Sequence, residues 1–112
     1  MSRARDRTRP AASATVFAAL GDATRLGLVQ RLSGGEPLSI AQLTEGTRVT
    51  RQAVTKHLAV LADAGLVRGT RAGREVRWQL EPARLAEMRA YLDQISRRWD
   101  VALARLRAAV ER

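Results

Sequence analysis

The sequence contains no cysteine and a single histidine, His57, among its 112 residues. A chain without cysteine can form neither a disulfide nor a thiolate metal site. One histidine cannot build a multi-histidine metal site within one chain. The sequence also lacks a nucleophile–base pair, a phosphate-binding loop and a plausible carboxylate pair. We therefore expect no metal, no cofactor, no catalytic residues and no enzymatic activity.

Long apolar runs are missing as well. The longest uncharged stretch runs from Pro10 to Gly21, far short of the ~20 apolar residues that a membrane span needs. The arginine-rich start followed by AASATVFAAL is faintly similar to a secretion signal, but Asp22 and Arg25 follow at once. That run is better interpreted as a first helix, so we expect a cytoplasmic location.

Lysine is nearly absent, because 19 of the 20 basic residues are arginine, and the net charge is +9. Residues 1–10 carry +3 and residues 47–77 carry +5, which leaves only +1 for the rest of the chain. Genomic base composition can enrich arginine, but it does not decide where the charge goes. This distribution indicates an interaction with a polyanion.

The apolar pattern predicts one mainly α domain with a small β-hairpin. Residues 1–10 are expected to be a disordered basic arm, residues 11–81 a winged helix domain and residues 82–112 a C-terminal dimerisation helix. Within the domain we predict helices over 11–20, 22–32, 40–45 and 51–64, and strands over 66–70 and 75–80. The second helix should face inward with Leu28, Val29 and Leu32, and Leu26 should lie beside them.

Capping signals fix most of these boundaries. Asp22 and Thr50 are good N-cap residues, and Ser39 forms a capping box with Gln42. Gly65 is suited to the C′ position of the fourth helix. The order of helices and hairpin predicts a winged helix-turn-helix.

The helix over 51–64 has a polar face whose long side chains are confined to its first two turns. Val54, Leu58 and Leu61 form the opposite, apolar face. In a helix that enters the major groove the N-terminal residues contact bases, and small residues further along permit close approach. We therefore expect DNA contacts from the following residues: Arg48, Thr50, Arg51, Gln52, Thr55, Lys56 and His57. The alternative is an ordinary solvated face, and His57 is equally compatible with a place at the edge of the core.

The hairpin carries four arginines, and its predicted tip spans Arg71 to Arg74. Arg71 and Arg74 are expected to contact the minor groove or the DNA backbone as a wing. The alternative is a charged, solvated turn. Trp78 should lie in the core beneath the wing rather than stack on a base.

The segment from Pro82 to about Val110 contains neither glycine nor a further proline. Its apolar residues recur at steps of 3 and 4 over about four heptads, which is a seam that must be buried. The first helix can cover part of it, and we expect a symmetric homodimer to cover the rest. The predicted interface residues are Val16, Phe17, Leu20, Leu85, Met88, Leu92, Ile95, Trp99 and Leu106. Two reading helices related by a two-fold axis require an inverted-repeat site.

The run TRQAVTKHLAVLADAGLV, together with ALGDATRLGLVQRL, SIAQL and RGTRAGREVRWQL, resembles the ArsR/SmtB family of winged-helix transcriptional repressors. The resemblance covers about residues 13–80, and the C-terminal segment is similar to a metal-independent branch. It implies a dimeric repressor of operator DNA that often controls its own operon. It also places Thr50, Arg51, Gln52, Thr55, Lys56 and His57 in the recognition segment, and Arg71 and Arg74 in the wing.

The founding members of that family sense metals through cysteines near the third or recognition helix, or through Asp and His pairs on the last helix. Neither set of ligands is found at the corresponding positions here. The sequence thus predicts a sequence-specific repressor that binds double-stranded DNA as a homodimer, with no membrane partner. The alternative is a winged helix used for protein contacts. The operator, the regulated genes, any inducer and the role of the basic arm are not evident from the sequence.

Overall fold

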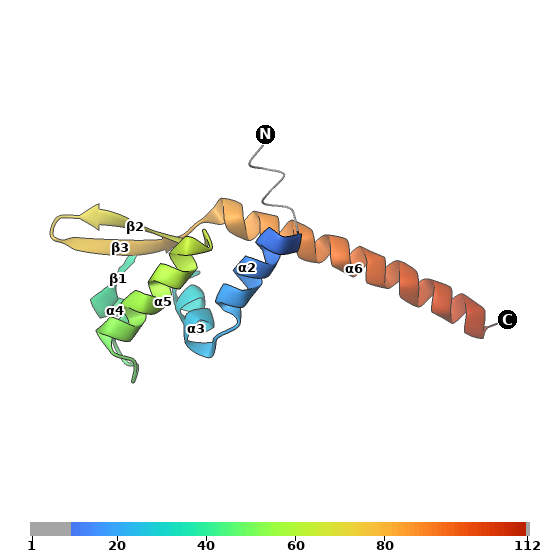
Figure 1. Cartoon of the computed structure of the whole chain (residues 1–112), viewed down its shortest axis with the longest axis horizontal. Helices are drawn as coiled ribbons and strands as arrows, with labels where there is room; N and C mark the ends of the chain where they lie inside the picture. Colours follow the sequence, from blue (N-terminus) through green and yellow to red (C-terminus); the bar gives the residue numbers. More distant parts are fainter. Residues whose placement is uncertain (1–9, 112) are drawn as a thin grey trace.

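The computed structural model describes residues 10–111. Apart from Pro10, which begins the first helix, the predicted basic arm lies outside these residues. The elements in chain order are α2 (Pro10–Leu20), α3 (Ala23–Leu32), β1 (Leu38–Ser39), α4 (Ile40–Thr44), α5 (Arg51–Asp63), β2 (Val67–Ala72), β3 (Glu75–Leu80) and α6 (Pro82–Val110). The prediction of a mainly α winged helix with a long C-terminal helix is confirmed (Figure 1).

The helix ends form where the capping residues predict them. The side chain of Asp22 accepts a hydrogen bond from Arg25 N at 3.0 Å, and Thr50 accepts one from Ala53 N at 3.1 Å. Ser39 and Gln42 form both hydrogen bonds of the capping box. Because these bonds satisfy amides that a helix start leaves unpaired, they fix where α3, α4 and α5 begin.

The C-terminal end of α5 is a Schellman motif. Gly65 has φ +78°, Gly65 N donates to Ala62 O, and Leu66 N donates to Leu61 O, both at 2.9 Å. A left-handed residue at this position is readily tolerated only when it is glycine. Gly65 therefore turns the chain sharply from α5 into β2.

The sheet has three antiparallel strands in the order β1-β3-β2, one more than the sequence predicts. The additional strand pairs Leu38 with Trp78 and Ser39 with Arg77. A two-residue strand is too short to leave an alternating pattern, so the sequence gives no sign of it.

The hairpin turn is also tighter than predicted. Ala72 pairs with Glu75, so only Gly73 and Arg74 lie in the turn, and Arg71 belongs to β2. Gly73 has φ +65°, and none of the other residues from 10 to 111 except Gly35, Gly46 and Gly65 has a positive φ. A positive φ at only the first central residue is the pattern of a type II′ turn, which matches the twist of paired strands.

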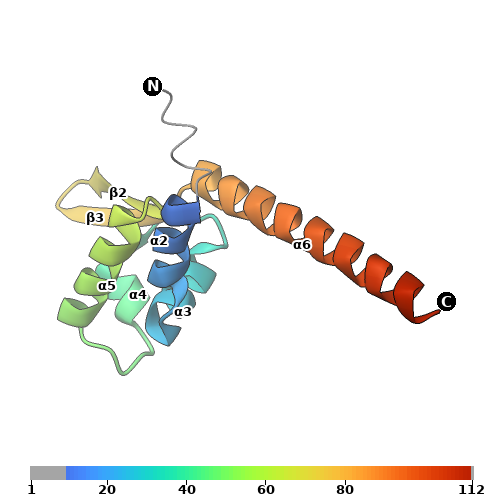
Figure 2. The same cartoon turned by 45° about the vertical axis from the view of Figure 1, so that its right-hand side comes forward.

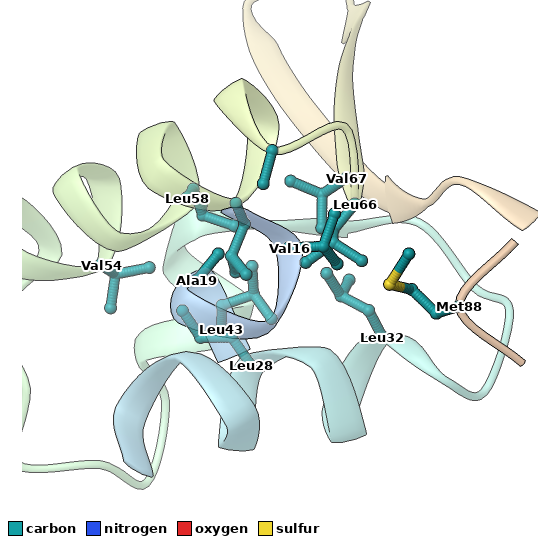
Figure 3. Close-up of a cluster of buried hydrophobic side chains, with 12 residues drawn as sticks. Val16, Ala19, Leu28, Leu32, Leu43, Val54, Leu58, Leu66, Val67 and Met88 are labelled. Atoms are coloured by element: carbon teal, nitrogen blue, oxygen red, sulfur yellow. The ribbon is translucent and has the colours of Figure 1, made fainter. Parts of the chain in front are cut away.

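The core lies between α2, α3, α5 and the start of the sheet (Figure 3). Leu28 and Leu32 are buried there and Val29 packs against them as predicted, whereas Leu26, expected beside them, is exposed. Trp78 also packs against this core, as the sequence predicts. Gly69, its partner on β2, makes room, since a Cβ there would lie 3.2 Å from the Trp78 ring and 2.8 Å from Val76 Cγ1.

Helix α6 packs on the domain only through its first turns and then projects away from it (Figure 2). Met88 joins the core and Leu85 packs against it. One turn further, the rings of Tyr91 and Phe17 lie 6.0 Å apart. None of the helices in residues 10–111 is both long enough and apolar enough to span a membrane.

Candidate nucleic-acid interface

The polar face of α5 is presented to solvent. Arg51, Gln52, Thr55 and Lys56 are all exposed, while Val54, Leu58 and Leu61 are buried on the other face. Within residues 10–111, the side chains of Arg51, Gln52 and Lys56 have no hydrogen-bond or ion-pair partner. Their donors and acceptors are thus available to another molecule.

Two threonines near the start of α5 are already engaged. Thr50 Oγ1 accepts the cap bond from Ala53 N, and Thr55 Oγ1 donates to Arg51 O at 2.8 Å. A hydroxyl that donates to its own helix retains only its acceptor capacity and its methyl group. Thr55 can therefore accept a hydrogen bond from a base or contact a thymine methyl, but it does not have a free proton to donate.

His57, predicted either as a DNA contact or as a residue at the edge of the core, lies at the edge of the core and stays partly exposed. Its Nδ1 is 3.4 Å from Arg25 Nη1 and 4.0 Å from Asp22 Oδ2, with 24% of its side chain exposed. It occupies the apolar side of α5, so its ring faces the start of α3 rather than the exposed polar face. The same helical geometry that exposes Lys56 turns its neighbour inward.

Arg25 joins α2, α3 and α5 at this point. Its Nε donates to Ala19 O at 2.6 Å and its Nη2 to Ala18 O at 3.4 Å. The hydrogen bond from the Arg25 amide lowers the pKa of Asp22, and the positive charge of Arg25 acts in the same direction. This role could not be predicted from the sequence, because nothing in the sequence shows that the last carbonyls of α2 approach α3.

A second arginine holds the short helix α4. Arg31 Nη1 donates to Leu43 O and Nη2 to Gln42 O, both at 2.8 Å. These carbonyls lie in the last turn of α4 and have no partner within so short a helix. Arg31 consequently fixes α4, the first helix of the helix-turn-helix, against α3.

The four hairpin arginines divide into two pairs. Arg77 Nε lies 3.0 Å from Glu75 Oε1, and Arg68 Nε lies 3.2 Å from Glu81 Oε1. Arg71 and Arg74, the two predicted DNA contacts, are exposed and form no ion pair within residues 10–111. Arg48, in the turn before α5, is likewise exposed and unpaired in that part of the chain.

The hairpin tip and the first turns of α5 lie at the same end of the molecule, opposite the C-terminal end of α6, in both views (Figures 1 and 2). The segments that carry the predicted basic residues, the start of α5 and the hairpin tip, therefore share one end of the molecule. Across residues 10–111, no three His, Asp or Glu side chains are grouped in a way that could hold a metal ion.

The predicted interface residues fall into two sets. Val16 and Met88 are 1% and 6% exposed, so the structure assigns them to the core of the single chain instead of a surface, because the start of α6 packs against the domain. Phe17, Leu20 and Leu85 are partly buried around that core. Leu92, Ile95, Trp99 and Leu106 are exposed, with Trp99 at 63% and Leu106 at 62%.

A short helix, a turn, a second helix with a polar exposed face and a basic hairpin define a winged helix-turn-helix protein. Residues 20–70 match a family model described as a helix-turn-helix domain. The chain is 44% identical over 85 residues to the HTH-type transcriptional regulator Rv2034 of Mycobacterium tuberculosis, covering 76% of each chain. It is 36% identical to a probable mercury resistance operon repressor of Streptomyces lividans, covering 72% of this chain and 64% of that one.

The structure is similar to that of an ArsR-like transcriptional regulator from Rhodococcus sp. RHA1, with a TM-score of 0.76 and 38% identity, covering 88% of this chain and 92% of that one. The chain belongs to the ArsR family of winged helix-turn-helix transcriptional regulators. It is a DNA-binding transcriptional regulator, and its relatives are regulators rather than enzymes.

Proposed function

We propose that this protein represses transcription as a homodimer that binds an inverted-repeat operator, with α5 in the major groove and the hairpin tip on the backbone or in the minor groove. The observation that carries the proposal is the set of unpaired side chains in the first two turns of α5, Arg51, Gln52 and Lys56. The hairpin tip, which carries the unpaired Arg71 and Arg74, lies at the same end of the molecule (Figure 1).

Each of these side chains suits a particular part of DNA. Arg51 can donate two hydrogen bonds to a guanine, and Gln52 can form a bidentate pair with an adenine. Lys56, Arg48 and the N-terminal end of α5, where Thr50 lies, suit phosphate groups. Thr55, with its proton donated to Arg51 O, can accept from an exocyclic amino group or contact a thymine methyl.

The exposed stripe on α6 supports self-association. Leu92, Ile95, Trp99 and Leu106 leave a large apolar surface in water, and fully burying one such side chain is worth about 1.5–3 kcal/mol. A second copy offers the same stripe, and partly buried Phe17 and Leu20 on α2 can extend the contact. Half-sites read by a symmetric pair should lie about 34 Å apart.

We further propose that DNA binding is independent of metal ions, because the chain has no cysteine and α6 has no histidine. Its place of action would be the cytoplasm, where a regulator of this family meets the chromosome. Micromolar zinc or cadmium added to the purified protein should leave its affinity for DNA unchanged.

Fluorescence anisotropy with DNA from upstream of its own gene tests the main proposal. We expect saturable binding that survives excess unrelated DNA and weakens steeply with salt, because phosphate contacts release counterions. Binding that is equal on all sequences, or absent, would instead favour the alternative of a winged helix used for protein contacts.

A further inference from the structure

The C-terminal end of α5 is covered by Arg84 from α6. A Cβ placed on Gly65 would lie 2.6 Å from Arg84 Nη2 and 2.7 Å from Arg84 Nε. The guanidinium thus lies directly against the backbone at the point where α5 ends. A cation in this position also interacts favourably with the partial negative charge of a helix C-terminus.

Arg84 is itself held in place by a neighbour on its own helix. Its Nη1 lies 3.1 Å from Glu87 Oε2, and the two side chains are only 23% and 20% exposed. A half-buried pair of this kind is screened less than a surface pair. Arg84 is therefore anchored to α6 at one end and contacts α5 at the other.

Helix α5 is held in the domain by the buried side chains of Val54, Leu58 and Leu61, and charged side chains contact it at two further points. Apart from Arg84 at Gly65, His57 on α5 lies against Arg25 and Asp22 at the start of α3. Arg25 also donates to a carbonyl in the last turn of α2. The two contacts are eight residues apart, which corresponds to roughly 12 Å along a helix axis. They connect α5 to α6 and, through Arg25, to α2, the two helices that carry the predicted dimer surface.

We propose that Arg84 is a positioning residue for DNA reading, which sets the angle between α6 and α5 through its contact with Gly65. This inference rests on the proposed function, because a fixed angle matters when two reading helices must match two half-sites. The dimer would set the positions of the α6 helices, and Arg84 would transmit that geometry to α5. Loss of Arg84 should loosen the choice of half-site spacing rather than abolish folding.

A distance measurement tests the proposal without DNA. The chain has no cysteine, so spin labels can be attached to Ala59→Cys on α5 and Ala90→Cys on α6, both exposed positions. Labelled chains are mixed with a tenfold excess of unlabelled chains, so that pairs within one chain dominate. We expect one narrow distance distribution in the parent and a broadened or displaced one in Arg84→Gln.

Arg89→Gln is the matched control, since Arg89 lies on the same helix, is exposed and has no partner within residues 10–111. It removes the same charge and should leave the distribution unchanged. Equal distributions in Arg84→Gln and Arg89→Gln would overturn the proposal, whatever the protein does on DNA. Thermal unfolding of each variant confirms that the distances are measured on folded protein.

A second readout uses an inverted-repeat site recovered by selection from random DNA. Insertion of one base pair between the half-sites should weaken the parent at least about tenfold, roughly the effect of losing a good base contact. The ratio of the two affinities, without and with the inserted base pair, should fall toward one in Arg84→Gln. It should also fall in Arg84→Lys, which keeps the charge but not the planar fork. A ratio retained in both variants, or an equal loss on every DNA, would contradict the positioning role.

Discussion

At the scale of single residues, the arginines of this protein fall into two groups, those bonded to backbone carbonyls and those without a partner in the described chain. Arg25 and Arg31 direct their guanidinium groups at backbone carbonyls that a helix end leaves unpaired. Arg51, Arg71 and Arg74 have no partner within residues 10–111. Composition does not distinguish these groups, and only the positions of nearby helix ends do so.

Replacement of Gln52 by alanine should cost about 1–3 kcal/mol of binding free energy at one base pair and relax the preference there. The physical reason is the loss of a bidentate contact in the groove. Binding curves on operators with each base substituted in turn measure this effect. Gln30→Ala, an exposed glutamine on α3, serves as control, and equal weakening on all sequences would mean that Gln52 touches only phosphate.

Asp22 makes the free energy of unfolding depend on pH in the acid range. Its pKa is lowered mainly by the hydrogen bond from the Arg25 amide, so the folded state binds the proton less tightly than the unfolded state does. The stabilisation is therefore complete above the ordinary value of about 3.9 and is lost as the pH falls through the lowered pKa.

Asp22→Asn should remove that pH dependence while keeping an N-cap, because asparagine caps helices as well as aspartate does. Urea unfolding midpoints between about pH 2 and 6 should show a shallower acid decline in the variant than in the parent. Parallel curves would show that Asp22 contributes nothing to the decline.

At the scale of elements, the wing offers a controlled comparison between free and paired arginines. Arg74 is free within residues 10–111, whereas Arg77 is paired with Glu75 on the same strand. Both lie near the hairpin tip, and each substitution to alanine removes one positive charge.

Arg74→Ala should weaken binding on all sequences and reduce the slope of log affinity against log salt by about 1, because one phosphate contact is lost. Arg77→Ala should change the slope less, since Glu75 already neutralises that charge. Affinities measured at several salt concentrations give both slopes. Equal slopes for the two variants would contradict a direct phosphate contact by Arg74.

Elements with local signals could be predicted from the sequence, and elements that depend on distant contacts could not. Asp22, Ser39 and Thr50 marked the helix starts, because a cap bond is made within three residues. Strand β1 and the burial of Met88 were missed, because Leu38 becomes a strand only by pairing with Trp78 and Met88 is buried only by packing on the domain. The exposed polar face of α5 was predictable from its period, but the inward contact of His57 with Arg25 was not.

At the scale of the whole molecule, the apolar stripe of α6 is a large hydrophobic surface that the described chain leaves exposed to solvent. The helix has 29 residues, and all of its side chains from Leu92 to Val110 are exposed. A seam of this length and period is typical of helices that pair. Its burial by a second copy would double the number of phosphate contacts.

Trp99→Glu should give monomers with poor operator affinity, because a charge would have to be buried in the seam. Val101→Glu is the matched control, since Val101 is 51% exposed but lies two residues away and therefore on the opposite side of the helix. Sedimentation velocity gives the oligomeric state of both. An intact dimer in Trp99→Glu would show that the stripe serves another purpose.

The pairing of β1 with β3 has a consequence for how the protein would adapt to a duplex. Ser39 is both the N-cap of α4 and the partner of Arg77 in the sheet, so the wing and the helix-turn-helix are connected through this residue. Because hydrogen bonds already join the wing to the helix-turn-helix, the two should lose little conformational freedom when they bind DNA. Adjustment to an imperfect site would then fall mainly on the nucleic acid, and flexible base steps between the half-sites would be favoured over stiff ones.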